Sequence, residues 1–144
     1  MEQNQACQTF LLISPETMTE AETVSGLLDC DRCAAATIHV AIAANGTVTE
    51  LTTVSLLEDD TTVVTDFATV VANVTVALSA AHAVTYHVDR RGRARYLRLT
   101  VTTGAATNCD TVVAAVANLY KMYEAPGGTA DMRGSTNDTV VIVT

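Results

Sequence analysis

Two cysteines stand three positions apart in Cys30-Asp31-Arg32-Cys33, and two more, Cys7 and Cys109, lie far from them in the sequence. Four thiols are enough for a tetrahedral zinc site, but a zinc site of this kind ordinarily takes two closely spaced pairs. The C-x-x-C also lacks the βαβ setting of a thioredoxin-like redox motif. Free thiols are favoured, a disulfide and a metal site stay open as alternatives, and no cofactor is predicted.

The other side chains that could do chemistry show no catalytic spacing. His39, His82 and His87 are isolated on predicted strands and form neither H-x-x-x-H nor H-E-x-x-H. Serines are present, but no G-x-S-x-G nucleophile elbow occurs. The acidic run Glu58-Asp59-Asp60 is shorter than the alternating oxygen ligands of a calcium loop. These residues are expected to be hydrogen-bonded or solvated, and the sequence predicts that the protein is not an enzyme.

Arginine is concentrated in one place: five of the seven arginines fall between positions 90 and 98. Strand alternation predicts Arg93 and Arg95 on the face that carries Leu97 and Leu99. The charges could pair with carboxylates of the same chain, or form forks with carboxylates of a neighbouring subunit. Direct nucleic-acid binding is not expected, because the chain has a net charge of −8. The candidate interface residues in this segment are Arg90, Arg91, Arg93, Arg95, Tyr96 and Arg98.

The C-terminal residues form a second candidate interface. Val140, Val141, Ile142 and Val143 are too apolar to remain in water and too few to form a core of their own. Gly127-Gly128 precedes them and gives the chain freedom to leave the domain. The segment is therefore either an arm that pairs with another subunit's sheet or the last strand of its own domain.

The elements that position these residues are predicted to be strands. Alanine (22), valine (19) and threonine (24) supply 65 of the 144 residues, and there is no tryptophan. The segment 36–43 alternates strictly and is followed by Asn45-Gly46 and by 47–51, which predicts a hairpin with a type I′ turn. A second hairpin is predicted from the alternation in 84–88 and 97–101, with Gly92 in its loop.

Further strands are expected on either side of these hairpins. A first strand over 9–14 should end at Pro15, with a polar loop following to Glu22. Val63-Val64 could be a short edge, and 74–78 should turn back into 84–88. Residues 111–123 fit either a helical face or a strand, and the β-branched residues that open the segment favour a strand.

The fold class predicted from this pattern is all-β, an antiparallel β-sandwich or jelly roll of about 7–9 short strands with a C-terminal arm. Its organisation would be a polar arm over 1–8, a sandwich domain over 9–126, and an arm or last strand over 127–144. The uncharged run 67–88 is long enough for a membrane span, but the polar residues scattered through it favour two strands, and no membrane association is predicted. The polar start of the chain predicts no signal peptide.

The segment 87–101, centred on His87-Val88-Asp89-Arg90-Arg91-Gly92 and Arg93-Ala94-Arg95-Tyr96-Leu97-Arg98, resembles a v-D-x-[RK]-G-x-x-R-Y-[LV]-[RK] pattern in small virion proteins of tailed bacteriophages. The resemblance continues through 112–119 and, more loosely, through Gly26-Leu27-Leu28-Asp29 and the strand before Asn45-Gly46. It covers about the middle two-thirds of the chain. The C-x-x-C and the longer Gly127-Gly128 tail depart from the pattern.

The resemblance implies a capsid decoration or cement protein that is made in the host cytoplasm and located in the virion. Its partner would be the major capsid protein, whose subunits it would bridge and stabilise, and it would self-associate as a dimer or trimer. The alternative is a tail- or fibre-associated β-sandwich module that binds a host surface or a glycan.

Overall fold

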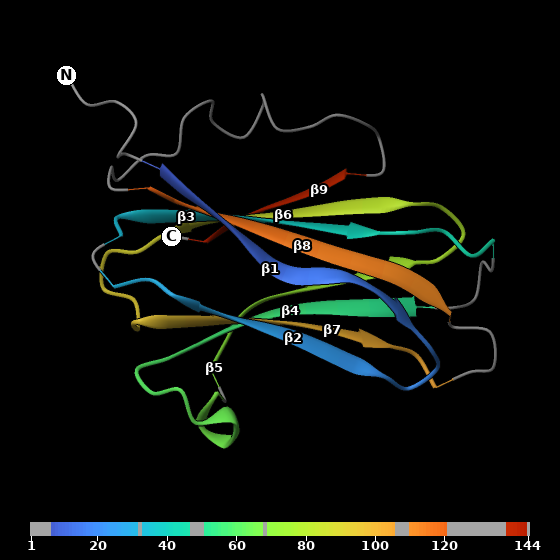
Figure 1. The fold of residues 1–144 in the computed structure, drawn as a ribbon, viewed down its shortest axis with the longest axis horizontal. Helices are drawn as coiled ribbons and strands as arrows, with labels where there is room; N and C mark the ends of the chain where they lie inside the picture. Colours follow the sequence, from blue (N-terminus) through green and yellow to red (C-terminus); the bar gives the residue numbers. More distant parts are fainter. Residues whose placement is uncertain are drawn as a thin grey trace.

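The computed structural model describes residues 7–31, 33–46, 51–67, 69–105, 110–120 and 138–143, which form nine strands in two packed sheets (Figure 1). One sheet contains, in order, β1 (Cys7–Met18), β8 (Thr111–Tyr120), β3 (Ala35–Ile42), β6 (His82–Asp89) and β9 (Asp138–Val143). The other contains, in order, β2 (Thr23–Asp29), β7 (Tyr96–Thr103), β4 (Leu51–Asp59) and β5 (Thr69–Ala77). The predicted all-β sandwich is therefore confirmed.

The strand pairing is that of a jelly roll. β1 pairs with β8, β2 with β7, β3 with β6 and β4 with β5, each antiparallel, as in a long hairpin rolled into a double sheet. The β3–β8 and β4–β7 pairs then join these ribbons into the two sheets. Two nested Greek keys of this kind define the jelly-roll arrangement.

Both predicted hairpins are wrong. The strands predicted at 36–43, 84–88 and 97–101 overlap β3, β6 and β7, whereas the one predicted at 47–51 meets β4 only at Leu51, and residues 47–50 lie outside the described residues. β3 lies in one sheet and β4 in the other, and β6 and β7 are separated in the same way. The turn expected between 74–78 and 84–88 likewise crosses between sheets, from β5 to β6. An alternating strand buries its apolar face equally well beside its neighbour or opposite it across the core, so local alternation does not decide between a hairpin and a crossing connection.

The ends of several elements also differ from the prediction. β1 runs through Pro15 to Met18, and two irregularities in its register with β8 adjust the strand on either side of Ile13. Proline is tolerated there because β1 lies at a sheet edge. Val64–Asp66 is a short 3-10 turn, not a strand edge. The segment from Thr111 to Tyr120 is a strand, as favoured.

The core lies between the sheets and is formed by the inward-facing residue of every second position. β8 shows the pattern over its whole length, with Val113, Ala115 and Ala117 buried and their neighbours more exposed. Tyr86 of β6 is fully buried, and its hydroxyl donates a hydrogen bond of 2.9 Å to the carbonyl of Val54 on β4. This bond ties the two sheets together through the centre of the molecule.

The C-terminal strand β9 pairs in parallel with β6 of its own chain, with Ala83 opposite Asp138 and Val88 opposite Val143. Val141 is half-buried and packs against the core. The segment thus takes the place of a last strand in its own sheet, and its pairing with another subunit stays a prediction. Gly127-Gly128 and residues 1–6 of the predicted arm lie outside the described residues, whereas positions 7 and 8 belong to β1.

Candidate functional site

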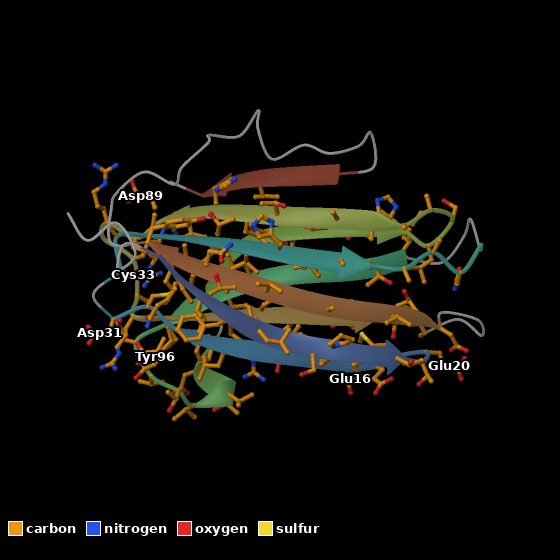
Figure 2. All side chains as sticks on the ribbon, turned by 45° about the horizontal axis from the view of Figure 1, so that its top comes forward. Glu16, Glu20, Asp31, Cys33, Asp89 and Tyr96 are labelled. Carbon is orange, nitrogen blue, oxygen red and sulfur yellow. The ribbon has the colours of Figure 1, made fainter. Side chains whose placement is uncertain are left out.

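The arginine-rich segment connects β6 to β7 at one end of the sandwich. Arg90 to Arg95 form this crossing loop, so Arg93 and Arg95 are not on a strand face, and that part of the prediction is wrong. Tyr96 and Arg98 do lie on β7 and face away from the buried Leu97. Asp89 and Tyr96 at either side of the loop lie at the same end of the molecule as Cys33 (Figure 2).

Two arginines of this loop bind carboxylates of β2 and β4, the strands on either side of β7. Arg95 donates to both oxygens of Asp29, from Nε at 2.9 Å and from Nη2 at 2.7 Å. Arg93 Nη1 lies 3.3 Å from Glu58 Oε1 on β4, and both side chains are largely buried. The backbone N–H of Arg95 also donates to Asp60 at 2.8 Å. The loop is therefore anchored to β2, to β4 and to the turn that follows β4.

The remaining arginines also have contacts within the chain. Arg91 is the most exposed of the paired ones and binds Asp89, its Nε lying 2.8 Å from Oδ2. Arg98 donates to Ser25 Oγ at 2.9 Å, and its guanidinium lies 5.8 Å from the ring centroid of Phe67. Intrachain pairing thus explains how the arginines coexist in one loop, while their contact with a neighbouring subunit stays a prediction.

These pairs shift the acidities of their carboxyl groups. The hydrogen bond from Arg95 holds the pKa of Asp29 below its ordinary value, and the hydrogen bonds from Arg91 do the same for the pKa of Asp89. Asp29 in turn raises the pKa of Arg95. The Arg95–Asp29 and Arg91–Asp89 pairs are therefore favoured in their charged forms.

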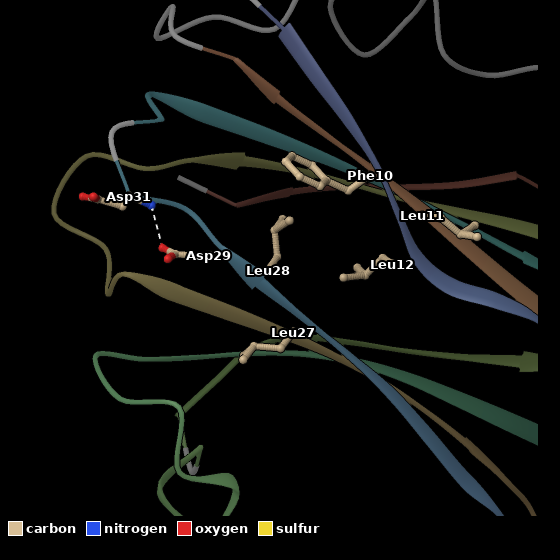
Figure 3. Close-up of a pocket in the computed structure, with 7 residues that line it drawn as sticks. All are labelled: Phe10, Leu11, Leu12, Leu27, Leu28, Asp29 and Asp31. Atoms are coloured by element: carbon tan, nitrogen blue, oxygen red, sulfur yellow. Dashed lines mark hydrogen bonds between the residues drawn. The ribbon is translucent and has the colours of Figure 1, made fainter.

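A second surface, which sequence reasoning missed, lies between the edge strands β1 and β2. Phe10, Leu11 and Leu12 of β1 and Leu27 and Leu28 of β2 line a hollow of about 370 Å³, with Asp29 and Asp31 at its rim (Figure 3). Three of the apolar side chains are exposed: Phe10 by 40%, Leu11 by 62% and Leu27 by 46%. We call this hollow the edge groove.

The two edge strands come together at one point beside the edge groove. A Cβ atom added to Gly26 of β2 would lie 2.4 Å from the carbonyl oxygen of Leu12. Only glycine permits this approach of the two backbones. In the described part of the chain β1 pairs with β8 alone and β2 with β7 alone, so each strand keeps one unpaired edge beside the groove.

The signal for the edge groove is a break in alternation. Phe10-Leu11-Leu12-Ile13 and Leu27-Leu28 place apolar residues at consecutive positions. Because neighbouring side chains of a strand point to opposite faces, some of these residues must face away from the core. Leu28 is buried and Leu27 faces outward, as alternation requires. Leu11 is exposed although Ile13 is buried, because the register of β1 shifts between these two residues.

The histidines take structural positions on β3 and β6. His39 Nδ1 lies 3.2 Å from Thr85 Oγ1, and His87 Nδ1 lies 3.1 Å from Thr37 Oγ1, across the same pair of strands. Burial lowers the pKa of His39, and burial together with the nearby His39 lowers the pKa of His87. Both rings are therefore neutral at pH 7 and serve as hydrogen-bonding partners of threonine.

Within the described ranges, no three His, Cys, Asp or Glu side chains gather closely enough to hold a metal ion. No helix in those ranges is long and apolar enough to cross a membrane. No protein-family model matches the chain, and no curated protein matches it either. Fold and surface chemistry are therefore the grounds on which its function can be inferred.

Proposed function

We propose that this protein is a structural component of a tailed-bacteriophage virion, a decoration or cement protein that bridges and stabilises major capsid subunits. The observation that carries the proposal is the edge groove, where exposed Phe10, Leu11 and Leu27 lie beside two unpaired strand edges. Clustered apolar side chains of this kind are typical of protein–protein contacts. A partner strand or loop would cover them and gain backbone hydrogen bonds as well.

Two further features support the proposal. The segment 87–101 resembles small virion proteins of tailed phages, and the jelly roll is an architecture used by viral capsid proteins. Lectins use the same architecture, so the fold by itself does not separate a capsid protein from a glycan-binding module. Tyr96 is a half-buried ring, and the Arg95 guanidinium lies 4.9 Å from its centroid, so the protein's own arginine occupies one face on which a sugar could stack.

The copy number in purified virions tests the proposal. Quantitative mass spectrometry should find hundreds of copies per particle, and particles that lack the protein should release DNA at a lower temperature or lower salt concentration. A few to tens of copies would indicate a tail or fibre module instead. Depleted particles that withstand heating as well as complete ones would contradict the cement role.

A pair of variants tests the surface. Leu11→Asp combined with Leu27→Asp should abolish binding to particles that lack the protein, because both carboxylates would be buried in the contact. Val64→Asp is the matched control, since Val64 is exposed by 63% but lies in the 3-10 turn away from the groove. Normal occupancy of the double variant on particles would show that the groove is not the contact.

A further inference from the structure

The turn between β2 and β3 places two thiols next to each other at the end of the sandwich that carries the arginine loop. The backbone N–H of Cys33 donates to the carbonyl of Cys30 at 3.2 Å, which closes the turn. Cys30 is buried and Cys33 is half-buried, and both are free thiols. Cys33 is therefore the one that a reagent in solution can reach.

A buried guanidinium lies beside this pair. Arg90 is only 8% exposed, and its backbone N–H donates to Ala34 at 3.0 Å, while its Nη2 donates to the carbonyl of Ala94. Its Nε and Nη1 are buried and have no hydrogen-bond partner among the described residues. Buried donors of a charged group nearly always have a hydrogen-bond acceptor, so an acceptor is expected beside Nε and Nη1 of Arg90.

Arg90 and the two cysteines line the same small cavity, where the thiol sulfurs can accept hydrogen bonds from Arg90. Arg90, Cys30 and Cys33 line a cavity of about 230 Å³ with Asp31, Asp60, Arg93 and Arg95. Arg95 is engaged by Asp29 and Arg93 by Glu58, so those two cations are neutralised by carboxylates. Arg90 lies in the same hollow as both thiols, and its charge acts on each of them.

The pKa values of the two thiols are shifted in opposite directions. The hydrogen bond with Cys30 lowers the pKa of Cys33, and Arg90 lowers it further, against the opposing effects of burial and of the Asp29 carboxylate. The same hydrogen bond, together with burial, raises the pKa of Cys30. Of the two thiols, Cys33 is therefore the one that loses its proton more readily.

We propose that Cys30, Cys33 and Arg90 form a thiol–disulfide exchange site for low-molecular-weight disulfides, with Cys33 as the attacking thiol and Cys30 as the resolving thiol. This site adjoins the edge groove, with which it shares Asp31, but it does not depend on the proposed virion function.

The exchange takes place in two steps. The Cys33 thiolate attacks one sulfur of the small disulfide, whose S–S bond breaks, and one small thiolate leaves and is protonated by solvent. Cys30 then loses its proton to solvent and attacks the Cys33 sulfur, which expels the second small thiolate. Two protein thiols are oxidised to one disulfide, and the small disulfide is reduced to two thiols.

Glutathione disulfide is a suitable probe. In a full-length background with Cys7→Ser and Cys109→Ser, mass spectrometry after acid quenching should show an internal disulfide and little mixed disulfide. Cys30→Ser should accumulate the glutathione adduct on Cys33, because the resolving thiol is gone. Cys33→Ser should stay largely unmodified. Adduct accumulation on Cys30 in the last variant, or no reaction of Cys33 in the Cys30→Ser variant, would overturn the proposal.

The role of Arg90 is tested by the rate of alkylation with iodoacetamide as a function of pH. The Cys33 thiol should titrate below the ordinary thiol value of about 8.5. Arg90→Gln should raise that midpoint and slow alkylation at pH 7 by about tenfold, the effect of roughly one pKa unit. Arg91→Gln is the control, because Arg91 is the neighbouring residue and binds Asp89.

Two controls separate the effect of the Arg90 charge from a loss of folding. Thermal unfolding of Arg90→Gln establishes that the variant is folded, and Arg90→Lys, which keeps the charge, should retain most of the rate. A wild-type midpoint at or above 8.5, or equal rates for Arg90→Gln and Arg91→Gln, would contradict the assigned role of Arg90.

Discussion

The guanidinium of Arg95 and the carboxylate of Asp29 form a two-bond fork between neighbouring strands of one sheet, at 2.9 and 2.7 Å. Arg95 comes directly before β7, and Asp29 is the last residue of β2, so the fork closes the end of that strand pair, where Asp29 is opposite Tyr96. Both side chains are about half exposed. The fork defines the position of the arginine loop more than it stabilises the fold, because exposed ion pairs contribute little.

The two ion pairs of the loop should respond differently to removal of the arginine. Arg95→Gln should lower the free energy of unfolding only slightly, since solvent screens the exposed pair. Arg93→Gln should cost about 1–3 kcal/mol, because it leaves the largely buried Glu58 carboxylate without its cation. Urea unfolding at pH 7 measures both values. Equal losses for the two variants would contradict this ranking.

Gly26→Ala should destabilise the protein by about 1–3 kcal/mol, the usual cost of overpacking. The added Cβ would meet the carbonyl oxygen of Leu12, which belongs to the backbone and cannot rotate away. Gly92→Asn is the comparison, since Gly92 has a positive φ of 71° and open space around it, and asparagine tolerates that conformation. Thermal unfolding should separate the two variants clearly, and an unchanged melting temperature for Gly26→Ala would show that β1 can move aside.

Stability should decline on mild acidification because of His39 and His87. The folded-state pKa of each is lowered from its ordinary value of 6.5, so the unfolded chain binds protons more readily. Their contribution is complete above pH 6.5 and decreases as the pH falls below that value. Replacing both with asparagine should flatten the stability profile between pH 7.5 and about 5 in urea titrations. A wild-type profile that is already flat over this range would contradict the prediction.

Val141→Asp should weaken the attachment of β9, because Val141 packs against the core. The expected loss is about 1–3 kcal/mol, that of a half-buried apolar side chain replaced by a charge. Deleting residues 138–144 should have a similar effect and leave the edge of β6 unpaired, so the truncated chain should also associate in sedimentation experiments. A truncated monomer that unfolds at the wild-type temperature would instead favour an arm that docks on another subunit.

Alternation in the sequence was enough to locate most strands, because one face of each is buried. It missed β2 and all of β4 but its first residue, Leu51. It also could not assign strands to sheets: residues 36–43 alternate in the same way whether the next strand lies beside them or faces them across the core. The extension of β1 past Pro15 was also missed, since it depends on the edge position of the strand.

The candidate sites were predicted to a similar extent. The arginine cluster is local and visible in the sequence, but its partners Asp29 and Glu58 lie on strands brought near by the long-range topology. The same is true of Arg90 and Cys33, which are 57 positions apart (33 to 90) and meet in one hollow. Composition and spacing along the chain do not reveal which residues distant in the sequence come into contact.

The jelly-roll pairing joins the first strand to one made much later, which delays folding of that strand during translation. β1 cannot form its ladder until β8 exists, and Cys7 is opposite Tyr120, 113 positions later (7 to 120). At a translation rate of roughly 5–20 residues per second, the first strand waits about 6–23 s for its partner. During that time its apolar residues could pair with other nascent chains. Pro15 has no backbone N–H to donate and interrupts any regular ladder there, so the proline that complicates this strand in the folded state also protects it before folding.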